Sequence, residues 1–413
     1  MAGRAVSGLS RRFGQGRGSQ VGGKVAYRLR RQTLRDLAAH RQVALVSATN
    51  GKSTTAALLA AAASTLGPLA FNRTGANMEE GLVVALDADR RAPFAVLETD
   101  EAYLGVVVAA TRPRVIVLMN LSRDFLERGV RAKVLARHWH DTLATIDWPC
   151  TVVANCDDPL VAWAVSTAPR VVWVAGEDTF TADSQLCRDC LVHLTRDGAS
   201  WSCPHCGFTR HDPHWRLDHD QVALTAVGLD GSVGLPAALP GRAAAVNALF
   251  ALAAAVQLGV APHVAAEKIA EIENVDGRYA PRAFGDHAVR VLLAKNPASW
   301  TASLATVTAA TKTSASLLLA MHGRGAGGGQ DTALLWDAPF ETLAGRRVTV
   351  AGSRGPELAL RLSAAGVEFD LAGDDILAAI EALPPGHVDL VGNWPAFNAV
   401  LDVLGRDDAV VPK

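Results

Sequence analysis

The stretch that most constrains the fold runs from Val43 to Gly67 and reads VALVSATNGKSTTAALLAAAASTLG. Its opening Val/Leu-rich run predicts a buried strand, the polar residues Ser47 to Ser53 predict a tight loop, and the Ala/Leu-rich run predicts a helix. Such a loop exposes the first backbone N–H groups of the helix, and the helix dipole adds to their attraction for an anion. The segment therefore predicts a phosphate-binding site.

The loop supplies six candidate nucleotide contacts, which are Thr49, Asn50, Gly51, Lys52, Ser53 and Thr54. We expect Lys52 to pair with the outer phosphates of a nucleotide and the Ser53 hydroxyl to hold Mg2+. The strict loop pattern asks for a glycine five residues before Gly51, where this chain has Val46. A Gly-Lys-Ser tripeptide alone also fits an ordinary strand-to-helix turn, so the prediction depends on the flanking strand and helix.

Strands and helices alternate along most of the chain. Between residues 41 and 277, five apolar runs each end in a polar or Gly/Asp-rich loop: VALVSA, FAVLET, VIVLMN, CTVVAN and VVWVAG. Near-continuous apolar runs of this length are typical of strands buried on both faces of a parallel sheet. The sequence predicts an α/β fold, with a doubly wound domain over residues 41–277 and a smaller α/β domain over residues 278–413.

Acidic residues follow the second of these strands, at the sheet edge where ligands bind in such folds. FAVLET runs into Glu98, Asp100 and Glu101. Because Mg2+ prefers oxygen ligands, we choose Glu98 as a second magnesium ligand with a catalytic role. Helix capping or a surface ion pair would also account for the neighbouring acids, and for Asp100 the two readings are equally good.

An insertion over residues 184–212 carries two C-x2-C pairs separated by a twelve-residue spacer. The spacer, LVHL then a DG turn then SWSC, predicts a short hairpin between two metal-binding knuckles. Four thiolates would complete a tetrahedral shell, which favours a structural Zn2+ over disulfides or a metal-free remnant. The predicted zinc ligands are Cys187, Cys190, Cys203 and Cys206.

The net charge and the apolar runs of the chain bear on its partners and its location. The net charge of -1 gives no argument for binding nucleic acid. Apolar runs fall short of the ~18 residues of a spanning helix, and no signal-peptide pattern follows the start, so we expect a cytoplasmic protein. The extension over residues 1–40 is strongly basic. It either contacts anionic lipid at the inner face of the membrane or packs on the first domain as a solvated extension.

Several motifs, taken in order, resemble those of the Mur ligase family, ATP-dependent enzymes that join amines to carboxylates in peptidoglycan precursors. They are ATNGKSTT, NRTGANMEEGL, LETDEAYL, ANCDDP, VDGRYA and AKNPAS. The four-cysteine insertion and the WDAPFE stretch narrow the resemblance to the branch that amidates lipid II together with a GatD-type glutaminase. The likeness runs from about residue 28 to the C-terminus.

This resemblance implies a reaction and further site residues. ATP would phosphorylate the α-carboxylate of D-isoglutamate in the lipid II stem peptide, and ammonia from the glutaminase would attack the acyl phosphate. Arg278 would meet the phosphates, Asn247 would contact the adenine, and Asp331 would be lent to the glutaminase's Cys-His pair. The stretch before that aspartate departs from the family pattern, as GAGGGQD, so Asp337 competes with it. Lys295 stands where many Mur ligases have His, which suits ammonia as the acceptor.

Two other functions fit the same residues. A stand-alone ligase of the Mur or folylpolyglutamate type would add an amino acid and would need no glutaminase. A non-catalytic nucleotide-binding scaffold would use the cysteine insertion to dock a partner. The stand-alone ligase would turn over without ammonia, and the scaffold would function without Lys52. The amidase needs both.

Overall fold

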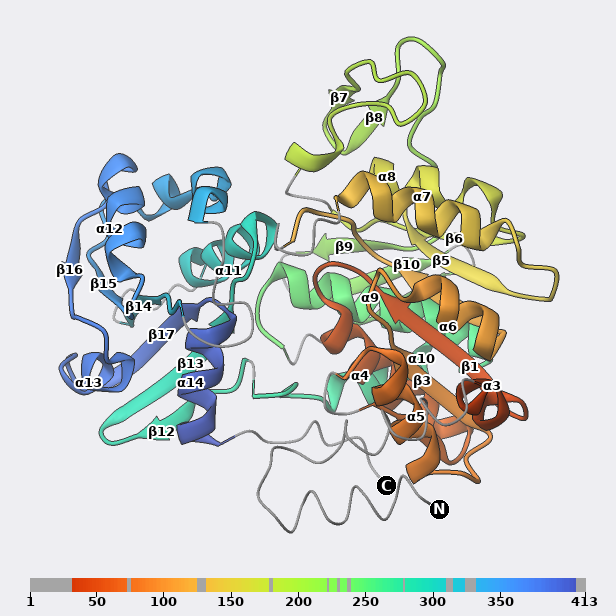
Figure 1. Ribbon diagram of the computed structural model, residues 1–413, viewed down its shortest axis with the longest axis horizontal. Helices are drawn as coiled ribbons and strands as arrows, with labels where there is room; N and C mark the ends of the chain where they lie inside the picture. The colour runs from red at the N-terminus through yellow and green to blue at the C-terminus, as the bar shows by residue number, and fades with distance from the viewer. Residues whose placement is uncertain are drawn as a thin grey trace.

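The computed structural model describes residues 32–72, 76–124, 131–177, 181–220, 223–228, 231–235, 239–277, 279–309, 315–323 and 332–405. Two α/β blocks lie side by side, and a small projection extends from the N-terminal block (Figure 1). None of the described helices is long and apolar enough to cross a membrane.

The first block is built on a six-stranded parallel sheet with the order β2-β3-β1-β4-β5-β6. Its strands are β1 (Gln42–Ser47), β2 (Leu69–Phe71), β3 (Phe94–Glu98), β4 (Val115–Leu118), β5 (Thr151–Asn155) and β6 (Val171–Val174). The five predicted strands all form. The additional strand, β2, has only three residues and is too short to show a periodic pattern.

Alternate residues of the strands enter two separate cores, as the period of two requires. In β1, Ala44 and Val46 pack in the core that contains α4 and α9, whereas Val43 and Leu45 pack in the core on the opposite face. The small side chains of the Ala-rich helices α4 and α9 let these two helices pack against each other. The helices of this block are α3 (Thr33–Ala38), α4 (Lys52–Ala63), α5 (Glu79–Ala88), α6 (Leu104–Thr111), α7 (Ala132–Leu143), α8 (Pro159–Ala164), α9 (Arg242–Leu258) and α10 (Pro262–Ala270), with short 3-10 turns η1 (Ser64–Leu66), η3 (Val165–Thr167) and η4 (Ala182–Ser184).

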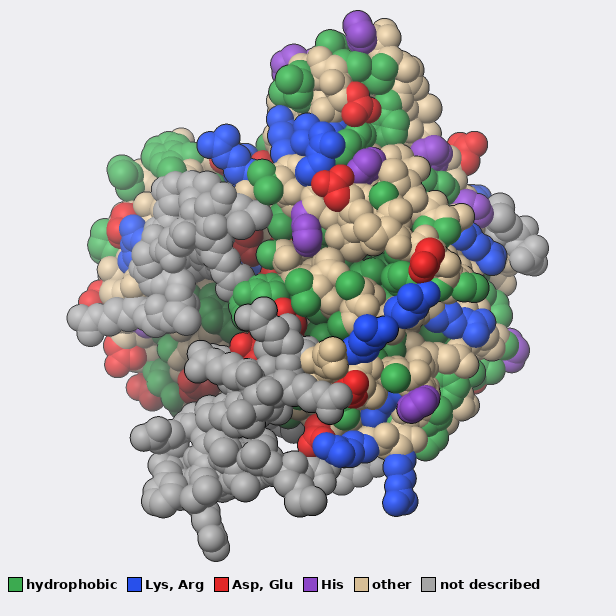
Figure 2. Space-filling view, turned by 45° about the vertical axis from the view of Figure 1, so that its right-hand side comes forward, with side chains coloured by type: hydrophobic (Ala, Val, Ile, Leu, Met, Phe, Trp, Pro, Cys, Tyr) green, Lys and Arg blue, Asp and Glu red, His purple; other side chains and the backbone are tan. Residues whose placement is uncertain are grey.

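The cysteine-containing insertion lies between β6 and α9 and forms the projection, which stands out as a separate lobe in the space-filling view (Figure 2). Its hairpin pairs β7 (Thr195–Asp197) with β8 (Ser200–Ser202). The first hairpin strand therefore starts four residues later than predicted, because Leu191 adopts a positive φ of 59° that continues the first cysteine knuckle instead of starting a strand. An antiparallel sheet follows, made of β9 (Arg216–Asp220), β10 (Ala223–Gly228) and β11 (Gly231–Gly234).

The second block contains a six-stranded sheet with the order β12-β13-β17-β14-β15-β16, parallel except for the edge strand β12. The strands are β12 (Arg282–Phe284), β13 (His287–Leu293), β14 (Ser316–Ala320), β15 (Val348–Ala351), β16 (Phe369–Leu371) and β17 (Gly386–Gly392). The helices are α11 (Pro297–Ala309), α12 (Gly355–Ala364), α13 (Ile376–Glu381) and α14 (Trp394–Leu404), with 3-10 segments η5 (Thr332–Asp337) and η6 (Phe340–Leu343). The sequence predicted a smaller α/β domain here, and its three-residue edge strands are too short to show a periodic pattern.

Candidate active site

The phosphate loop joins β1 to α4, as the sequence predicts. Gly51 caps α4 with a φ of 87°, in the left-handed region that glycine adopts without strain. A Cβ atom at Gly51 would lie 2.5 Å from Asn247 Oδ1 and 3.1 Å from Met119 Cε, so the site also excludes a side chain by close packing. Lys52, Ser53 and the residues after them open α4, and this helix N-terminus can bind an anion.

The loop is held by the segment that follows β4. Asn120 exchanges two hydrogen bonds with Asn50, because Asn50 N donates to Asn120 Oδ1 at 2.9 Å and Asn120 Nδ2 donates to Asn50 O at 3.0 Å. Ser122 N donates to Thr49 Oγ1 at 3.1 Å. Asn50 Nδ2 also donates to Ser122 Oγ at 3.2 Å, so the side chains of Thr49 and Asn50, predicted as nucleotide contacts, brace the loop in this structure. Their backbone N–H groups donate to Asn120 as well.

The segment after β4 is itself fixed by Asp158, from the acidic end of β5. Asp158 is 2% exposed and caps α8, and its Oδ2 accepts from Leu121 N at 2.8 Å. Burial raises the pKa of Asp158 to about 6, although the backbone N–H donors oppose that shift. Asp158 therefore caps α8 and also supports the phosphate loop, through Leu121.

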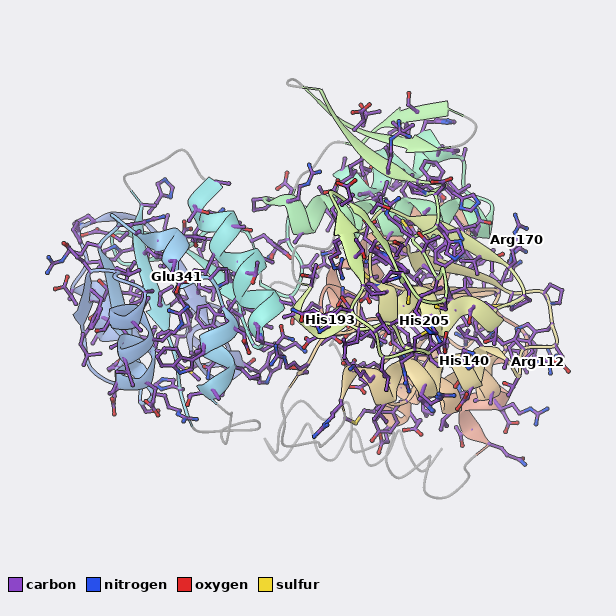
Figure 3. The ribbon with its side chains drawn as sticks, turned by 90° about the horizontal axis from the view of Figure 1, so that it is seen from above. Arg112, His140, Arg170, His193, His205 and Glu341 are labelled. Carbon is purple, nitrogen blue, oxygen red and sulfur yellow. The ribbon has the colours of Figure 1, made fainter. Side chains whose placement is uncertain are left out.

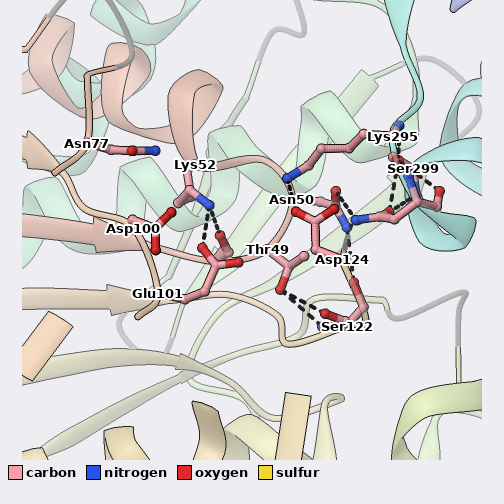
Figure 4. Close-up of polar contacts among 12 residues, drawn as sticks. Thr49, Asn50, Lys52, Asn77, Asp100, Glu101, Ser122, Asp124, Lys295 and Ser299 are labelled. Atoms are coloured by element: carbon pink, nitrogen blue, oxygen red, sulfur yellow. Dashed lines mark hydrogen bonds and ion pairs between the residues drawn. The ribbon is translucent and has the colours of Figure 1, made fainter. Parts of the chain in front are cut away.

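Lys52 is buried among carboxylates at the centre of the site (Figure 4). Its Nζ lies 2.7 Å from Glu101 Oε2 and also donates to Ala48 O. Burial alone would lower the pKa of Lys52, but the charges of Glu101, Glu98 and Asp100 outweigh it and raise that pKa. Burial conversely favours neutral Glu101, yet Lys52 and Lys295 hold its pKa below the usual value. The ammonium and carboxylate are therefore both charged at neutral pH.

Glu98, the predicted magnesium ligand, lies beside this pair but makes different contacts. Its carboxylate accepts from Asn77 Nδ2 at 3.1 Å, and its backbone N donates to Asn72 Oδ1 at 2.8 Å. Asp100 Oδ1 accepts from Ala102 N at 3.0 Å in a turn, whereas Tyr103 is the cap residue of α6. Both acids are buried. No sequence pattern indicates that Glu101, the third acid, is the one that pairs with Lys52.

The second block closes over the phosphate loop through residues of the AKNPAS motif (Figure 4). Asn296 Nδ2 donates to Asn50 Oδ1 at 3.1 Å, and Asn50 Nδ2 donates back to Asn296 Oδ1 at 3.3 Å. Lys295 Nζ lies 2.5 Å from Asp124 Oδ2. Ser299 fixes the motif by accepting from Lys295 N and Asn296 N, at 2.9 Å each. The site therefore lies between the two blocks.

The junction between the blocks reaches the first turn of α4. Tyr279 OH lies 3.4 Å from Thr54 Oγ1, and Tyr279 has a positive φ of 78°, a strained conformation for a non-glycine residue. Asn247, predicted at the adenine, is 6% exposed on α9 against Gly51. The predicted phosphate contact Arg278 lies outside the described residues.

The candidate residue for a glutaminase partner also lies outside the described part of the chain. That residue is Asp331, next to the first described residue of η5. Its competitor Asp337 is described, and its Oδ2 lies 3.0 Å from Arg123 Nη1, on the loop after β4. Asp337 thus joins the second block to the first.

The four cysteines of the insertion converge, as their spacing predicts. Their sulfur atoms all lie within 4.8 Å of one another, and each of the four cysteines is a free thiol. The two cysteine knuckles have the same hydrogen-bond pattern. Leu191 N donates to Cys187 O in the first, and Gly207 N donates to Cys203 O in the second. Both donor residues have a positive φ. His193 and His205 lie in the same lobe (Figure 3) but outside this group. Four sulfur atoms this close form a cluster that could hold one metal ion.

Comparisons with known proteins agree with this architecture. Residues 293–387 match the family described as MurT ligase C-terminal. A curated Streptococcus pneumoniae (strain ATCC BAA-255 / R6) protein, "Lipid II isoglutaminyl synthase (glutamine-hydrolyzing) subunit MurT", is 29% identical over 429 residues, which cover 96% of this chain and 94% of the relative. The protein of the same name from Staphylococcus aureus (strain N315) is 26% identical, covering 94% of this chain and 93% of the relative.

Solved structures share the fold at low sequence identity. A pseudomurein peptide ligase type C from Methanothermus fervidus has a TM-score of 0.66 at 16% identity, covering 88% of this chain and 78% of that one. MurF ligase from Thermotoga maritima, solved in complex with ADP, has a TM-score of 0.64 at 14% identity, covering 93% and 83%. The α/β fold, the phosphate loop and the four-cysteine lobe accord with the near full-length similarity of this chain to MurT subunits.

Proposed function

We propose that this chain is the synthetase subunit of a lipid II isoglutaminyl synthase. It uses ATP to phosphorylate the α-carboxylate of D-isoglutamate in the lipid II stem peptide. Ammonia supplied by a GatD-type glutaminase then attacks the acyl phosphate and releases phosphate, leaving D-isoglutamine and ADP. The observation that carries the proposal is the charged, buried Lys52 at the start of α4, covered by the AKNPAS motif of the second block.

The residues around Lys52 suit phosphoryl transfer to a carboxylate. This chemistry depends on positioning and on neutralising charge on the transferred group. Lys52 and the N–H groups of α4 would bind the phosphates, and Lys295 adds a second cation at the junction. In the role we propose, Ser53 and Glu98 would hold Mg2+, whose charge would offset that of the phosphates. Arg278 and Asn247 keep their proposed roles at the phosphates and the adenine.

Further parts of the proposal concern the metal, the partner and the location. The cysteine cluster suits Zn2+, because four thiolates are typical of closed structural zinc sites. Asp331 is the residue we propose for the glutaminase's Cys-His pair, since Asp337 already pairs with Arg123. The enzyme would work in the cytoplasm, where its basic extension would meet the inner face of the membrane.

A single substitution tests the synthetase role. Lys52→Met removes the cation that we assign to the phosphates, and the matched control Lys268→Met removes an exposed lysine that pairs with Glu271. With lipid II, ATP, Mg2+ and ammonium salt, and isoglutamine formation followed by mass spectrometry, we expect Lys52→Met to lose about 100-fold or more in turnover. The control variant should keep the wild-type rate.

Other outcomes would favour the competing functions. Full activity of Lys52→Met in the cell, with the fold retained, would support a nucleotide-binding scaffold. ATP consumption that requires a free amino acid and ignores both ammonia and a glutaminase would support a stand-alone ligase. Either result would overturn the amidase.

A further inference from the structure

Ser122, which donates to Thr49 of the phosphate loop, is held on both sides. The N–H of the residue before it donates to Asp158 Oδ2 at 2.8 Å. The N–H of the residue after it, Arg123, donates to Asp183 Oδ2, also at 2.8 Å. The short segment that fixes the phosphate loop is therefore itself fixed by two carboxylates, one that follows β5 and one that belongs to η4.

Asp183 holds the side chain of Arg123 as well as its backbone. Asp183 Oδ1 lies 2.7 Å from Arg123 Nε, and the Asp183 side chain is 12% exposed. Contacts to an ionised carboxylate are stronger than contacts between neutral groups, and water and salt screen them less when the carboxylate is mostly buried. Asp183 is therefore a strong anchor for the segment that contacts the phosphate loop.

The hairpin of the cysteine lobe holds the residues that follow Asp183. Arg196 of β7 donates to Ser184 O at 3.2 Å and to Ser184 Oγ at 3.1 Å. Leu194 N donates to Gln185 O at 2.8 Å. Two residues further on, the N–H of the first cysteine donates to a carbonyl between the two knuckles, again at 2.8 Å. Printed contacts thus run without a gap from the cysteine cluster to Asp183 and the phosphate loop.

The same lobe is also attached to the end of β5. Trp201 Nε1 donates to Cys156 O at 3.1 Å. Arg210 Nε lies 2.5 Å from Asp157 Oδ1, and both of these side chains are largely buried. Cys156 and Asp157 directly precede Asp158 in the chain. The lobe therefore contacts both of the segments that hold Ser122.

The lobe has little apolar core of its own. Trp201 is the one large apolar side chain that is buried within residues 184–212, all of which the structure describes. A unit this small needs a metal ion or disulfides to stay folded, and its four cysteines are free thiols whose sulfur atoms converge. A three-residue turn such as η4 is also unstable alone. The position of Asp183 therefore depends on an intact cysteine cluster.

We propose that Asp183 is a positioning residue through which the cysteine lobe holds the phosphate loop in its nucleotide-binding conformation. Asp183 acts through Arg123 and Ser122. When the cysteine cluster loses its metal ion, η4 is released, and Ser122 keeps one anchor instead of two. Nucleotide affinity then falls. The inference rests on the nucleotide site of the proposed function, and it gives the cysteine lobe a role in binding the nucleotide.

The first test compares the ADP affinity of wild type, Asp183→Asn and a control in the metal-loaded full-length chain. Calorimetric titration with ADP and Mg2+ should show an affinity about 10-fold lower for Asp183→Asn, because the variant loses the ion pair and keeps only a neutral acceptor. The control is Asp197→Asn, which removes an exposed carboxylate at the hairpin of the same lobe and should bind ADP like wild type. Zinc content should be the same in all three proteins.

Turnover separates positioning from a general loss of folded protein. With lipid II and ammonium salt, Asp183→Asn should raise the KM for ATP about 10-fold while kcat at saturating ATP stays within about 3-fold of wild type. A residue that only stabilises the fold would instead lower the amount of active enzyme, and so kcat, at an unchanged KM.

The coupling can also be measured from the side of the metal. Because coupling between two binding sites is reciprocal, the nucleotide should hold the lobe closed. Saturating ADP and Mg2+ should slow the removal of Zn2+ by a chromophoric chelator about 10-fold in wild type and in Asp197→Asn, but not in Asp183→Asn.

Each part of the inference has an outcome that would overturn it. Wild-type ADP affinity in Asp183→Asn would show that the anchor is not needed. Zinc release from wild type that is unaffected by ADP would show that the lobe and the phosphate loop are independent. A fall in kcat alone would make Asp183 a structural residue. A wild-type protein that binds ADP but makes no product from ammonia would instead overturn the proposed amidation and leave the coupling in place.

Discussion

The pair between Lys52 and Glu101 gives the sharpest prediction about how the site works. We expect Glu101 to act as a counter-ion that holds Lys52 until phosphates take its place. Glu101→Gln keeps the shape of the side chain and removes its charge. The variant should be less stable than wild type without nucleotide, yet should bind the nucleotide more tightly, because the phosphates no longer compete with a carboxylate for Lys52.

The size of the effect follows from the geometry. At 2.7 Å and an effective dielectric constant of ~20, the gross attraction between the two charges is about 6 kcal/mol. Desolvation of two buried groups offsets much of that attraction. Glu98 and Asp100 still attract Lys52 in the variant. We therefore expect a loss of about 2–3 kcal/mol in the free energy of unfolding. Nucleotide affinity should rise about 10-fold, which corresponds to about 1.4 kcal/mol.

Urea unfolding without ligand and calorimetric titration with ADP and Mg2+ measure the two quantities. The control is Glu271→Gln, which breaks the exposed pair with Lys268 and should change stability by less than about 0.5 kcal/mol. Unchanged stability of Glu101→Gln would refute the counter-ion role. A fall in nucleotide affinity would show instead that Glu101 takes part in binding the nucleotide or its magnesium ion.

The same pair predicts how stability depends on pH. The pKa of Glu101 is lowered in the folded protein, so its contribution is present above the unfolded pKa of about 4.3 and is lost as the pH falls through the folded value. The pKa of Lys52 is raised, so its contribution is complete below about 10.4 and is lost as the pH rises through the folded value. Between these limits, the difference in stability between wild type and Glu101→Gln should not change with pH.

Two further predictions concern the metal cluster and the phosphate loop. Purified protein should carry about one zinc ion per chain by metal analysis, and Cys203→Ser should lose it and unfold or aggregate; a fully folded, metal-free wild type would contradict the assignment. Gly51→Ala should cost about 2 kcal/mol or more in unfolding free energy and abolish nucleotide binding, because Gly51 has a φ of 87° and a Cβ would meet Asn247 at 2.5 Å. Wild-type binding by Gly51→Ala would show that the loop can shift without loss.

The sequence predicted those parts of the fold that depend on local patterns. Apolar runs identified five strands of the first sheet, and the C-x2-C spacing identified the cysteine lobe. Edge strands such as β12 and β16 were missed, because three residues carry no period. The register of β3 against β1 puts Glu98 opposite Val46, but nothing in the sequence says which way the chain turns afterwards, so the pairing of Glu101 with Lys52 could not be predicted.

The contacts between the two blocks could not be predicted from the sequence, for a different reason. Asn50 and Asn296 are 246 residues apart, and their reciprocal hydrogen bonds depend on how two separate sheets are placed. The AKNPAS motif identified one of the two segments in contact, but it did not indicate that the phosphate loop is the other. The pairing of Arg123 with Asp337 has the same origin: the two residues lie in different blocks, and only the folded chain brings them together.

Val46, the departure from the strict loop pattern, has a consequence for the entropy of nucleotide binding. Because Val46 is a buried residue of β1 and pairs with Glu98, only four residues, 48–51, separate the sheet from α4. Two of these four, Thr49 and Asn50, are already tied to Asn120 and Ser122. Fixing a free residue costs about 1–2 kcal/mol of conformational entropy. A loop this short and this well tied has little freedom left to lose, so most of the energy of phosphate contact remains available for affinity.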